Sequence, residues 1–399
     1  MAASVETLQG RNGALKRDII SHCIHNGDFS IPDLGAELEV SIPTATKCVS
    51  ELMDAGLLED LGKAGTSGGR KPSLYGLNPS AGYFVGTEVH RETITIAVTN
   101  FKGQVVQVFH DVKFVLDNSE SRYQDMCQII GRCLTEAEIN RDEVMAYCFG
   151  FTGRVNHSTG YSMSYFIDEN RPTSEVLEQM LQGPVFIEND SRAMTYGEYT
   201  NGIIQDEKNI VFINASWGLG MGLILDGKLY YGQSGFSGEI GHFPMLSNGH
   251  ICQCGKTGCL ETGASGMALS RIVKEKLDSG MASTLRAKYN EKEPPSLGDI
   301  MEALKNEDVL AIEAIEEVGS NLGKGLAGVI NIFNPQLVVV GGLLSEAKDY
   351  LLLPMMTAIN KYSLRMVCKE TEIKFSRLGS KCGAIGACSL ARTRLLGLE

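Results

Sequence analysis

Three cysteines close together in the sequence form its clearest chemical pattern. They fall within eight residues: Cys252, Cys254 and Cys259. Three thiolates and one imidazole are the ligand set of a closed, structural zinc site, and Gly255 and Gly258 would let the backbone turn tightly around the ion. His242 and His250 are both open as the fourth ligand. We favour His242, because Gly241 and the longer loop let it close the ring without strain.

A second set of polar residues follows a predicted strand. The apolar run 185–187 leads into Glu188, Asn189 and Asp190. A carboxylate at the C-terminal end of a strand in an α/β protein is well placed to meet a ligand, although Asp190 could equally cap the following helix. Together with three residues around the cysteines, Asn189 and Asp190 could surround a polyhydroxylated ligand. Those three residues are Glu239, His242 and Glu261.

An α/β pattern must position these residues. After Tyr83, alternating or apolar runs predict strands over residues 93–99, 104–110, 146–151, 185–187, 210–213 and 337–340. Helical stretches fall between them, for example residues 121–139 and 308–333. With 43% apolar and 21% charged residues, the chain has material for a large core and is not mainly disordered. A length of 399 residues suggests two or three domains.

Ahead of this α/β part, residues 30–58 predict two helices joined by a tight turn. Ser30 caps the first helix and Ser41 the second, which has Pro43 in its first turn. A Gly-rich basic hairpin follows. This order is typical of a winged helix-turn-helix, which reads DNA with its second helix and its wing. The residues expected to meet DNA are Ser41, Thr44, Lys47, Ser50, Arg70 and Lys71.

The alternative for residues 1–80 is a generic three-helix subdomain or a protein-binding winged domain. These residues hold seven Lys/Arg against ten Asp/Glu, a net charge of −3, and the whole chain carries −12. This balance argues against broad adhesion to nucleic acid, but it leaves room for a small DNA-reading surface. The acidic residues lie mostly in the presumed first helices, whereas Lys47, Arg70 and Lys71 fall where phosphates and base edges would be met. DNA reading is therefore favoured.

The eleven cysteines and the first residues of the chain indicate in which cellular compartment the protein is expected. The cysteines are odd in number and are not spaced as a secreted disulfide framework. No stretch reaches ~18 consecutive apolar residues, and the first ten residues lack the basic and apolar regions of a signal peptide. We expect a soluble, cytoplasmic protein without a membrane partner.

The motifs together resemble the ROK family (repressors, open reading frames and sugar kinases), in its NagC/XylR-type branch. The resemblance covers essentially the whole chain and rests on residues 238–242 (GEIGH) with the three following cysteines, 188–190 (END), 340–342 (VGG) and 383–387 (GAIGA). It implies a winged helix-turn-helix over residues 1–80 and a two-lobed, actin-like (ribonuclease H-like) α/β domain. The lobes would be 81–190 and 191–399, with the C-terminal helix returning to the first lobe and sugar bound in the cleft.

The resemblance also implies which residues bind sugar. Seven match the family's positions: Gly153, Arg154, Asn189, Asp190, Glu239, His242 and Glu261. In kinase members of the family, the residue at the position of Asp190 is the general base that activates the sugar hydroxyl.

Two loops depart from the pattern of the family's kinases. Kinases carry an Asp followed by a Gly-Gly-Thr turn where this chain has residues 86–93 (GTEVHRET). His90 and Arg91 would crowd an approaching phosphate, and Glu92 would add a repelling charge. Kinases have Gly-Thr-Gly in the second loop, where residues 215–220 read ASWGLG and include the only tryptophan, Trp217.

We therefore expect a sugar-responsive transcriptional regulator, most simply a repressor. It would bind inverted-repeat operator DNA as a homodimer or homotetramer, and sense a sugar or sugar phosphate in a zinc-braced domain. The alternative is an ATP- and Mg-dependent hexose or N-acetylhexosamine kinase with Asp190 as general base. Asp190 and the Gly341-Gly342 pair favour that alternative, and the two altered loops oppose it.

Overall fold

The computed structural model describes residues 6–10, 12–63, 72–167, 170–289 and 294–398. The chain forms two compact units, Met1–Ala193 with Gly383–Glu399, and Met194–Cys382. The boundaries fall within α7 (Asp190–Asn201) and at the start of α14 (Cys382–Leu396). Among the described residues, no helix is both long and apolar enough to cross a membrane.

The N-terminal part of the first unit is a winged helix-turn-helix, called the head below. It comprises α2 (Gly13–Asn26), α3 (Ile31–Glu37), α4 (Ile42–Asp54) and a sheet of order β1–β3–β2, with β1 (Phe29–Ser30), β2 (Leu58–Lys63) and β3 (Ser73–Leu77). The Ser30 and Ser41 side chains accept backbone N–H groups and so cap α3 and α4. Glu39, with a φ of 53°, makes the turn between these helices. Leu34 and Leu52 are fully buried and anchor the two helices in the core.

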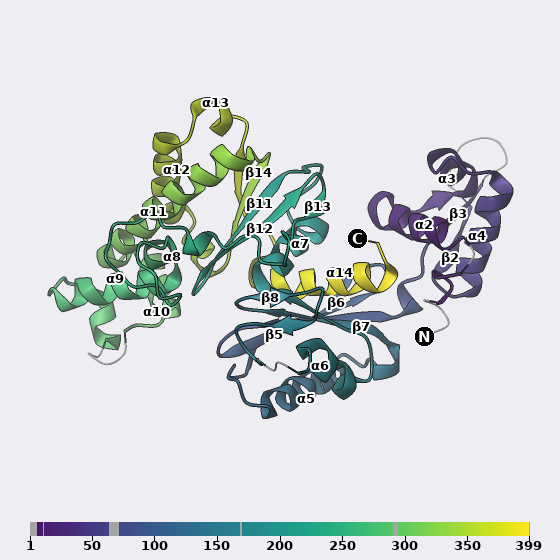
Figure 1. Cartoon of the computed structure of the whole chain (residues 1–399), viewed down its shortest axis with the longest axis horizontal. Helices are drawn as coiled ribbons and strands as arrows, with labels where there is room; N and C mark the ends of the chain where they lie inside the picture. The colour runs from purple at the N-terminus through teal and green to yellow at the C-terminus, as the bar shows by residue number, and fades with distance from the viewer. Residues whose placement is uncertain (1–5, 11, 64–71, 168–169, 290–293, 399) are drawn as a thin grey trace. The chain divides into compact units, whose positions relative to one another are not determined.

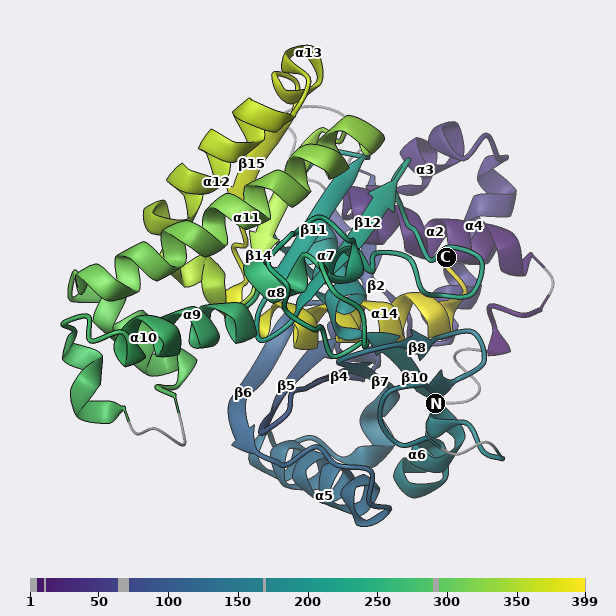
Figure 2. The same cartoon turned by 60° about the vertical axis from the view of Figure 1, so that its left-hand side comes forward.

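The rest of the first unit is built on a five-stranded sheet. In spatial order its strands are β10 (Val185–Asn189), β7 (Val144–Phe151), β4 (Tyr83–Val89), β5 (Thr93–Asn100) and β6 (Val105–Lys113). The strands β4, β5 and β6 are antiparallel, whereas β7 and β10 run parallel to β4. Helices α5 (Ser121–Glu136) and α6 (Thr173–Leu181) cover one face and α14 covers the other (Figures 1 and 2). A small hairpin pairs β8 (Val155–Asn156) with β9 (Tyr161–Ser162).

Helix α14 packs directly on the sheet of the first unit. Gly86 of β4 permits this close approach, because a Cβ there would overlap the carbonyl oxygen of Ala384. The Cys388 thiol donates to the carbonyl oxygens of Phe84 and Ala97 at 3.5 and 3.2 Å. The last helix of the chain is therefore part of the core of its first unit.

The second unit has a sheet of the same design. Its spatial order is β13 (Lys228–Leu229), β12 (Leu219–Leu225), β11 (Ile210–Ala215), β14 (Leu337–Gly341) and β15 (Glu372–Phe375). Alternate residues of β14 enter two cores, Val338 and Val340 on one face and Leu337 and Val339 on the other. The larger core includes α9 (Gly266–Asp278), α10 (Leu297–Lys305), α11 (Val309–Phe333) and α12 (Asp349–Tyr362). Two short helices are α8 (Glu261–Ala264) and α13 (Arg365–Cys368).

Both five-stranded sheets share one topology. Numbered along the chain within each sheet, the strands lie in the order 3-2-1-4-5, the first three antiparallel and the last two parallel to the first. This is the ribonuclease H-like arrangement of actin-like proteins. The predicted fold class is confirmed, and each predicted strand overlaps an observed one.

Candidate functional site

The four predicted metal ligands are gathered at one point of the second unit. The ligand atoms that lie within 4.8 Å of one another belong to His242, Cys252, Cys254 and Cys259. Nδ1 of His242 is 3.6 Å from Sγ of Cys252, and the Sγ atoms of Cys254 and Cys259 are also 3.6 Å apart. Zn–S bonds of ~2.3 Å would place the sulfur atoms of a tetrahedral site about 3.8 Å apart. The donor set and its spacing fit a zinc ion, and among the described residues His242, not His250, belongs to the cluster.

Tight backbone turns bring the cysteines together. The N–H of Gly255 donates to the Cys252 carbonyl, and the N–H of Cys252 donates to the Lys256 carbonyl. Gly255 and Gly258 have φ values of 82° and 79°, a region that glycine adopts without strain. At Gly258 a Cβ would also press on the carbonyl oxygen of Leu246. These two glycines therefore form tight turns, as the sequence predicted.

Two carboxylates flank the cysteine cluster. Oε2 of Glu239 faces Nε2 of His242 at 3.7 Å, across the ring from the nitrogen that meets Cys252. Oε2 of Glu261 accepts the backbone N–H of Leu219 at 3.1 Å, and its Oε1 lies 3.6 Å from Sγ of Cys252. Of the three predicted sugar residues of the second unit, Glu239 and Glu261 thus lie beside the predicted metal site, and His242 is one of its ligands.

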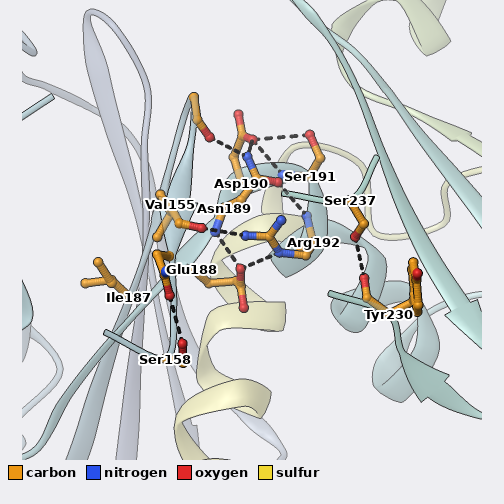
Figure 3. Close-up of polar contacts among 12 residues, drawn as sticks. Val155, Ser158, Ile187, Glu188, Asn189, Asp190, Ser191, Arg192, Tyr230 and Ser237 are labelled. Atoms are coloured by element: carbon orange, nitrogen blue, oxygen red, sulfur yellow. Dashed lines mark hydrogen bonds and ion pairs between the residues drawn. The ribbon is translucent and has the colours of Figure 1, made fainter. Parts of the chain in front are cut away.

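In the first unit, strand β10 ends at Asn189, and Asp190 begins α7 (Figure 3). Nδ2 of Asn189 donates to the Gly153 carbonyl at 2.8 Å and to Oδ1 of Asp190 at 2.9 Å. Oδ1 of Asn189 accepts the N–H of Arg192, which caps the first turn of α7. Gly153 and Arg154 lie exposed on the loop before β8. The structure brings Gly153, Asn189 and Asp190 together, and Arg154 is their neighbour in the loop.

The residue before them, Glu188, is fully buried and pairs with two arginines. Its Oε1 accepts from Nε of Arg192 at 2.6 Å, and its Oε2 accepts from Nη2 of Arg394 at 2.5 Å. Burial opposes ionisation, but the two guanidinium charges outweigh it and lower the pKa of the Glu188 carboxyl. Sequence reasoning missed both arginines. Arg192 offered a signal, since it follows Glu188 by four residues at the start of a helix, but Arg394 lies at the far end of the chain.

Two further carboxyl groups of the first unit lie in buried surroundings that disfavour their ionised form. Burial raises the pKa of Asp190, although the N–H of Ser191 offsets part of this rise. Burial also raises the pKa of Glu88 in β4, whose carboxylate accepts the N–H of Gly383 at the start of α14 and lies 3.8 Å from Nε2 of His90. Perturbed carboxyls of this kind are frequent at functional sites. Glu88 was also missed, and its only signal was an acidic residue inside an apolar strand.

The first of the two loops that depart from the kinase pattern forms the turn between β4 and β5. The N–H of His90 donates to the Thr93 carbonyl at 2.9 Å and closes the turn. The carbonyls of Arg91 and Glu92 accept N–H groups of the segment that follows β6. The turn therefore carries three side chains where glycines would leave backbone N–H groups open to a phosphate.

The second altered loop joins β11 to β12. Oγ of Ser216 donates to Oδ1 of Asn214 at 2.6 Å. Gly342 follows β14 and has a φ of 81°. It packs so closely against this loop that a Cβ at its position would overlap Ala215 and Ser216. Trp217 is 40% exposed. The loop thus presents an indole ring at its surface.

The predicted DNA-reading residues of the head lie at the start and on the surface of α4. Oγ of Ser41 accepts the N–H of Thr44 at 3.4 Å and lies 2.8 Å from its hydroxyl. Lys47 and Ser50 are exposed, with Nζ of Lys47 3.9 Å from Glu51. Two predicted residues of the wing lie outside the described part of the chain: Arg70 and Lys71.

A winged helix-turn-helix followed by two ribonuclease H-like sheets and a His/Cys cluster defines a narrow class of proteins. The chain belongs to the ROK family, whose model matches residues 84–394. The match takes in both five-stranded sheets and the cysteine cluster.

Known relatives include both repressors and a kinase. The xylose repressor of Caldicellulosiruptor bescii is 26% identical to this chain and the match covers 95% of each. The DNA-binding transcriptional dual regulator NagC of Escherichia coli is 27% identical, over 93% of this chain and 90% of NagC. A glucokinase of Halalkalibacterium halodurans is 27% identical over 79% of this chain and 97% of the kinase.

Solved structures divide in the same way. A ROK family transcriptional regulator, described as a homologue of the Escherichia coli Mlc protein, has a TM-score of 0.79 with 28% identity and covers 92% of both chains. A ROK family glucokinase from Streptomyces griseus, in complex with glucose and AMPPNP, has a TM-score of 0.67 with 26% identity. It covers 78% of this chain and 100% of its own.

Proposed function

We propose that this protein is a sugar-responsive transcriptional regulator that acts as a repressor. The observation that carries the proposal is a winged head joined in one chain to a ROK domain, a combination matched over 95% of both chains by a xylose repressor. The similar glucokinase matches only 79% of this chain although nearly all of the kinase is covered. The extra part of this chain is what a DNA-binding function needs.

Two groups of residues serve sugar recognition in this proposal, one carried by each unit. They are Gly153, Arg154, Asn189 and Asp190, and Glu239, His242 and Glu261. Carboxylates, an amide and an imidazole offer the paired donors and acceptors that sugar hydroxyls require. The hydrogen bonds of Asn189 to Gly153 and Asp190 hold the first group in one arrangement.

A structural zinc ion is part of the proposal. His242, Cys252, Cys254 and Cys259 would hold it, and four protein ligands leave no open position for substrate. The ion would have a structural role. Its ligands would keep two carboxylates in place, because Glu239 faces the His242 imidazole and Glu261 lies against the Cys252 thiol.

Operator binding would require more than one copy of the chain. A net charge of −12 leaves a single head too few phosphate contacts for tight specific binding. We propose a homodimer or homotetramer that reads an inverted repeat with paired α4 helices. Ser41, Thr44, Lys47 and Ser50 would face the DNA in the cytoplasm, with Arg70 and Lys71 on the wing.

Selection from random DNA with the full chain tests the proposal. We expect recovery of an inverted repeat whose affinity falls with salt and changes when D-xylose, D-glucose or N-acetyl-D-glucosamine is added. Recovery of no palindrome, with only weak salt-sensitive adhesion, would make the head a protein-binding module.

The second candidate is a hexose or N-acetylhexosamine kinase that uses ATP and Mg. The retained Asp190 and the match to two glucokinases favour it. The side chains of residues 90–92 and Trp217 oppose it, since both loops lack the open backbone that cradles phosphate. A coupled assay of ATP consumption across hexoses and amino sugars separates the two functions.

A further inference from the structure

Helix α14 holds the strand that ends at the proposed sugar residues. Nη2 of Arg394 donates to Oε2 of Glu188 at 2.5 Å, and Nη1 donates to the Ile187 carbonyl at 3.2 Å. One guanidinium thus grips two successive residues of β10 directly before Asn189. Figure 3 shows Ile187, Glu188 and Asn189 in line along this strand, with Arg192 reaching Glu188.

Glu188 connects Arg394 to the proposed sugar residues by hydrogen bonds. Oε1 of Glu188 accepts the backbone N–H of Asn189 at 2.8 Å as well as Nε of Arg192. Because Glu188 is fully buried, its carboxylate cannot exchange either arginine for water without a large penalty. A shift at Asn189 or Asp190 must therefore move Glu188 together with Arg394, or break a buried ion pair.

The same helix is tied to the head at its C-terminal end. Nη1 of Arg392 donates to the Phe101 carbonyl at 3.4 Å, and the next residue, Lys102, pairs with Asp28 of the head at 3.2 Å. A Cβ at Gly397, just past α14, would lie 3.3 Å from the side chain of Arg17 in α2.

The electrostatic surroundings of His25 in the head are consistent with the closeness of α14 to the head. Burial and the nearby charge of Arg392 both lower the pKa of His25 at the end of α2. Arg392 and Arg394 are separated by a single residue, so α14 contacts the sugar strand and Phe101, the neighbour of Lys102, within about one helical turn.

We propose that α14 couples the sugar residues to the head, with Arg394 as a positioning residue at the sugar end and the Lys102–Asp28 pair as a contact at the head end. The inference rests on the proposed sugar-responsive function. Sugar bound at Asn189 and Asp190 favours one position of Glu188. Because Arg394 is paired with Glu188, α14 takes the position that keeps this pair intact. The head then responds through the contacts of Arg392 and Lys102.

Three variants of the full chain test the coupling. Arg394→Gln removes the charge that pairs with Glu188, and Arg394→Lys keeps a charge but has one nitrogen where arginine uses two. Asp28→Asn removes the pair at the head end from a partly exposed site. Arg122→Gln is the matched control, because it removes an arginine that pairs with two exposed aspartates at the start of α5.

The measured quantity is the factor by which a probe sugar changes the affinity for a duplex selected by the wild-type chain. Probe sugars are D-xylose, D-glucose and N-acetyl-D-glucosamine. Substitutions along a coupled route change such factors by about 2–30-fold. We expect a reduction of this size in Asp28→Asn, with sugar affinity in the absence of DNA unchanged. Arg394→Gln should lose sugar affinity as well, Arg394→Lys should recover part of it, and Arg122→Gln should match the wild type.

A wild-type factor retained in Asp28→Asn would overturn the coupling. Hydrogen exchange on the sugar-free chain tests it independently of any ligand, since Arg394→Gln or Arg394→Lys should speed amide exchange both in β10 and in α2. Unchanged exchange in α2 beside faster exchange in β10 would also overturn it. A wild type that responds to none of the sugars would instead refute the proposed function, and the exchange result would still decide the coupling.

Discussion

Nδ1 of His242 lies 3.6 Å from Sγ of Cys252, while Nε2 of the same ring faces Glu239 at 3.7 Å. One imidazole thus joins the cysteine cluster to a carboxylate of the proposed sugar site. A carboxylate at the second ring nitrogen is common for metal-bound histidine, because it fixes the orientation of the ring. Metal content and sugar binding should therefore depend on each other.

Cys254→Ser should remove the zinc and weaken sugar binding together. A hydroxyl is a poor substitute for a thiolate ligand, and loss of the ion would free the loop that places Glu239 and Glu261. Elemental analysis of the wild type should find one zinc per chain, and calorimetry should follow sugar affinity. Cys368→Ser is the control, since this thiol lies outside the cluster. A Cys254→Ser variant with full sugar affinity would contradict the bracing role.

Two glycine substitutions should change stability in opposite directions. In Gly86→Ala the new methyl group meets the Ala384 carbonyl and the backbone of Cys388, so α14 must shift from β4. Overpacking of this kind costs about 1–3 kcal/mol of the free energy of unfolding. Gly328→Ala adds a methyl group within α11 with no atom inside 4 Å, and should gain about 0.5–1 kcal/mol. Urea unfolding measures both, and equal effects would contradict the close approach of α14.

The features that sequence predicted are those whose parts are near one another in the chain. The strands follow from apolar runs, and the ligand residues from His242 to Cys259 lie on one short segment. Helix α11 lies within the stretch 308–333 that the sequence predicted to be helical, and the side chain of Asp308 caps it. Each of these signals is local, and local signals suffice to place helices, strands and a metal loop.

The features that sequence did not predict depend on distant parts of the chain. Arg394 meets Glu188 across 206 positions, and the N–H of Gly383 meets Glu88 because α14 returns to the first sheet. No periodic pattern of residues in the sequence indicates such a long-range pair. For the fourth metal ligand the sequence favoured His242, but spacing also allowed His250, and it is the fold of the loop that places His242 in the cluster.

Asp190→Asn should raise stability near neutral pH while weakening sugar binding. Burial raises the pKa of Asp190, so the folded state resists the ionisation that the unfolded chain undergoes freely. Wild-type stability is therefore lost as pH rises from about 4, the ordinary pKa of an aspartate, through the raised pKa. The asparagine variant lacks this loss, and its advantage in melting temperature should vanish toward pH 4.

Asp142→Asn supplies the control for this pH dependence. Asp142 is exposed, and exposed substitutions usually change stability by less than about 0.5 kcal/mol. An Asp190→Asn variant that is less stable than the wild type at neutral pH would show that hydrogen bonds to the ionised carboxylate outweigh its burial.

Lys47→Ala should weaken binding to the selected operator. Lys47 is exposed on α4, one turn after Thr44, where a recognition helix meets base edges. A lysine that contacts a guanine contributes about 1–3 kcal/mol, and its loss should relax preference at one position of each half-site. Lys228→Ala, on the β12–β13 hairpin, should leave DNA affinity unchanged. A uniform loss over all sequences would mean that Lys47 contacts phosphate instead.

Phosphoryl transfer should be negligible, and the only tryptophan can report on nucleotide binding directly. Trp217 is 40% exposed in the loop that the family resemblance matches to the second phosphate loop of kinases, so a nucleotide bound there would change its fluorescence. We expect no change in Trp217 emission on addition of ATP and Mg, and sugar-dependent turnover below ~1 per second, under the range of typical kinases. Asp190→Asn identifies contaminating ATPase, because that signal would survive the substitution. Faster turnover that the substitution abolishes would establish the kinase instead, since only a reaction that needs Asp190 as its base would be lost with it.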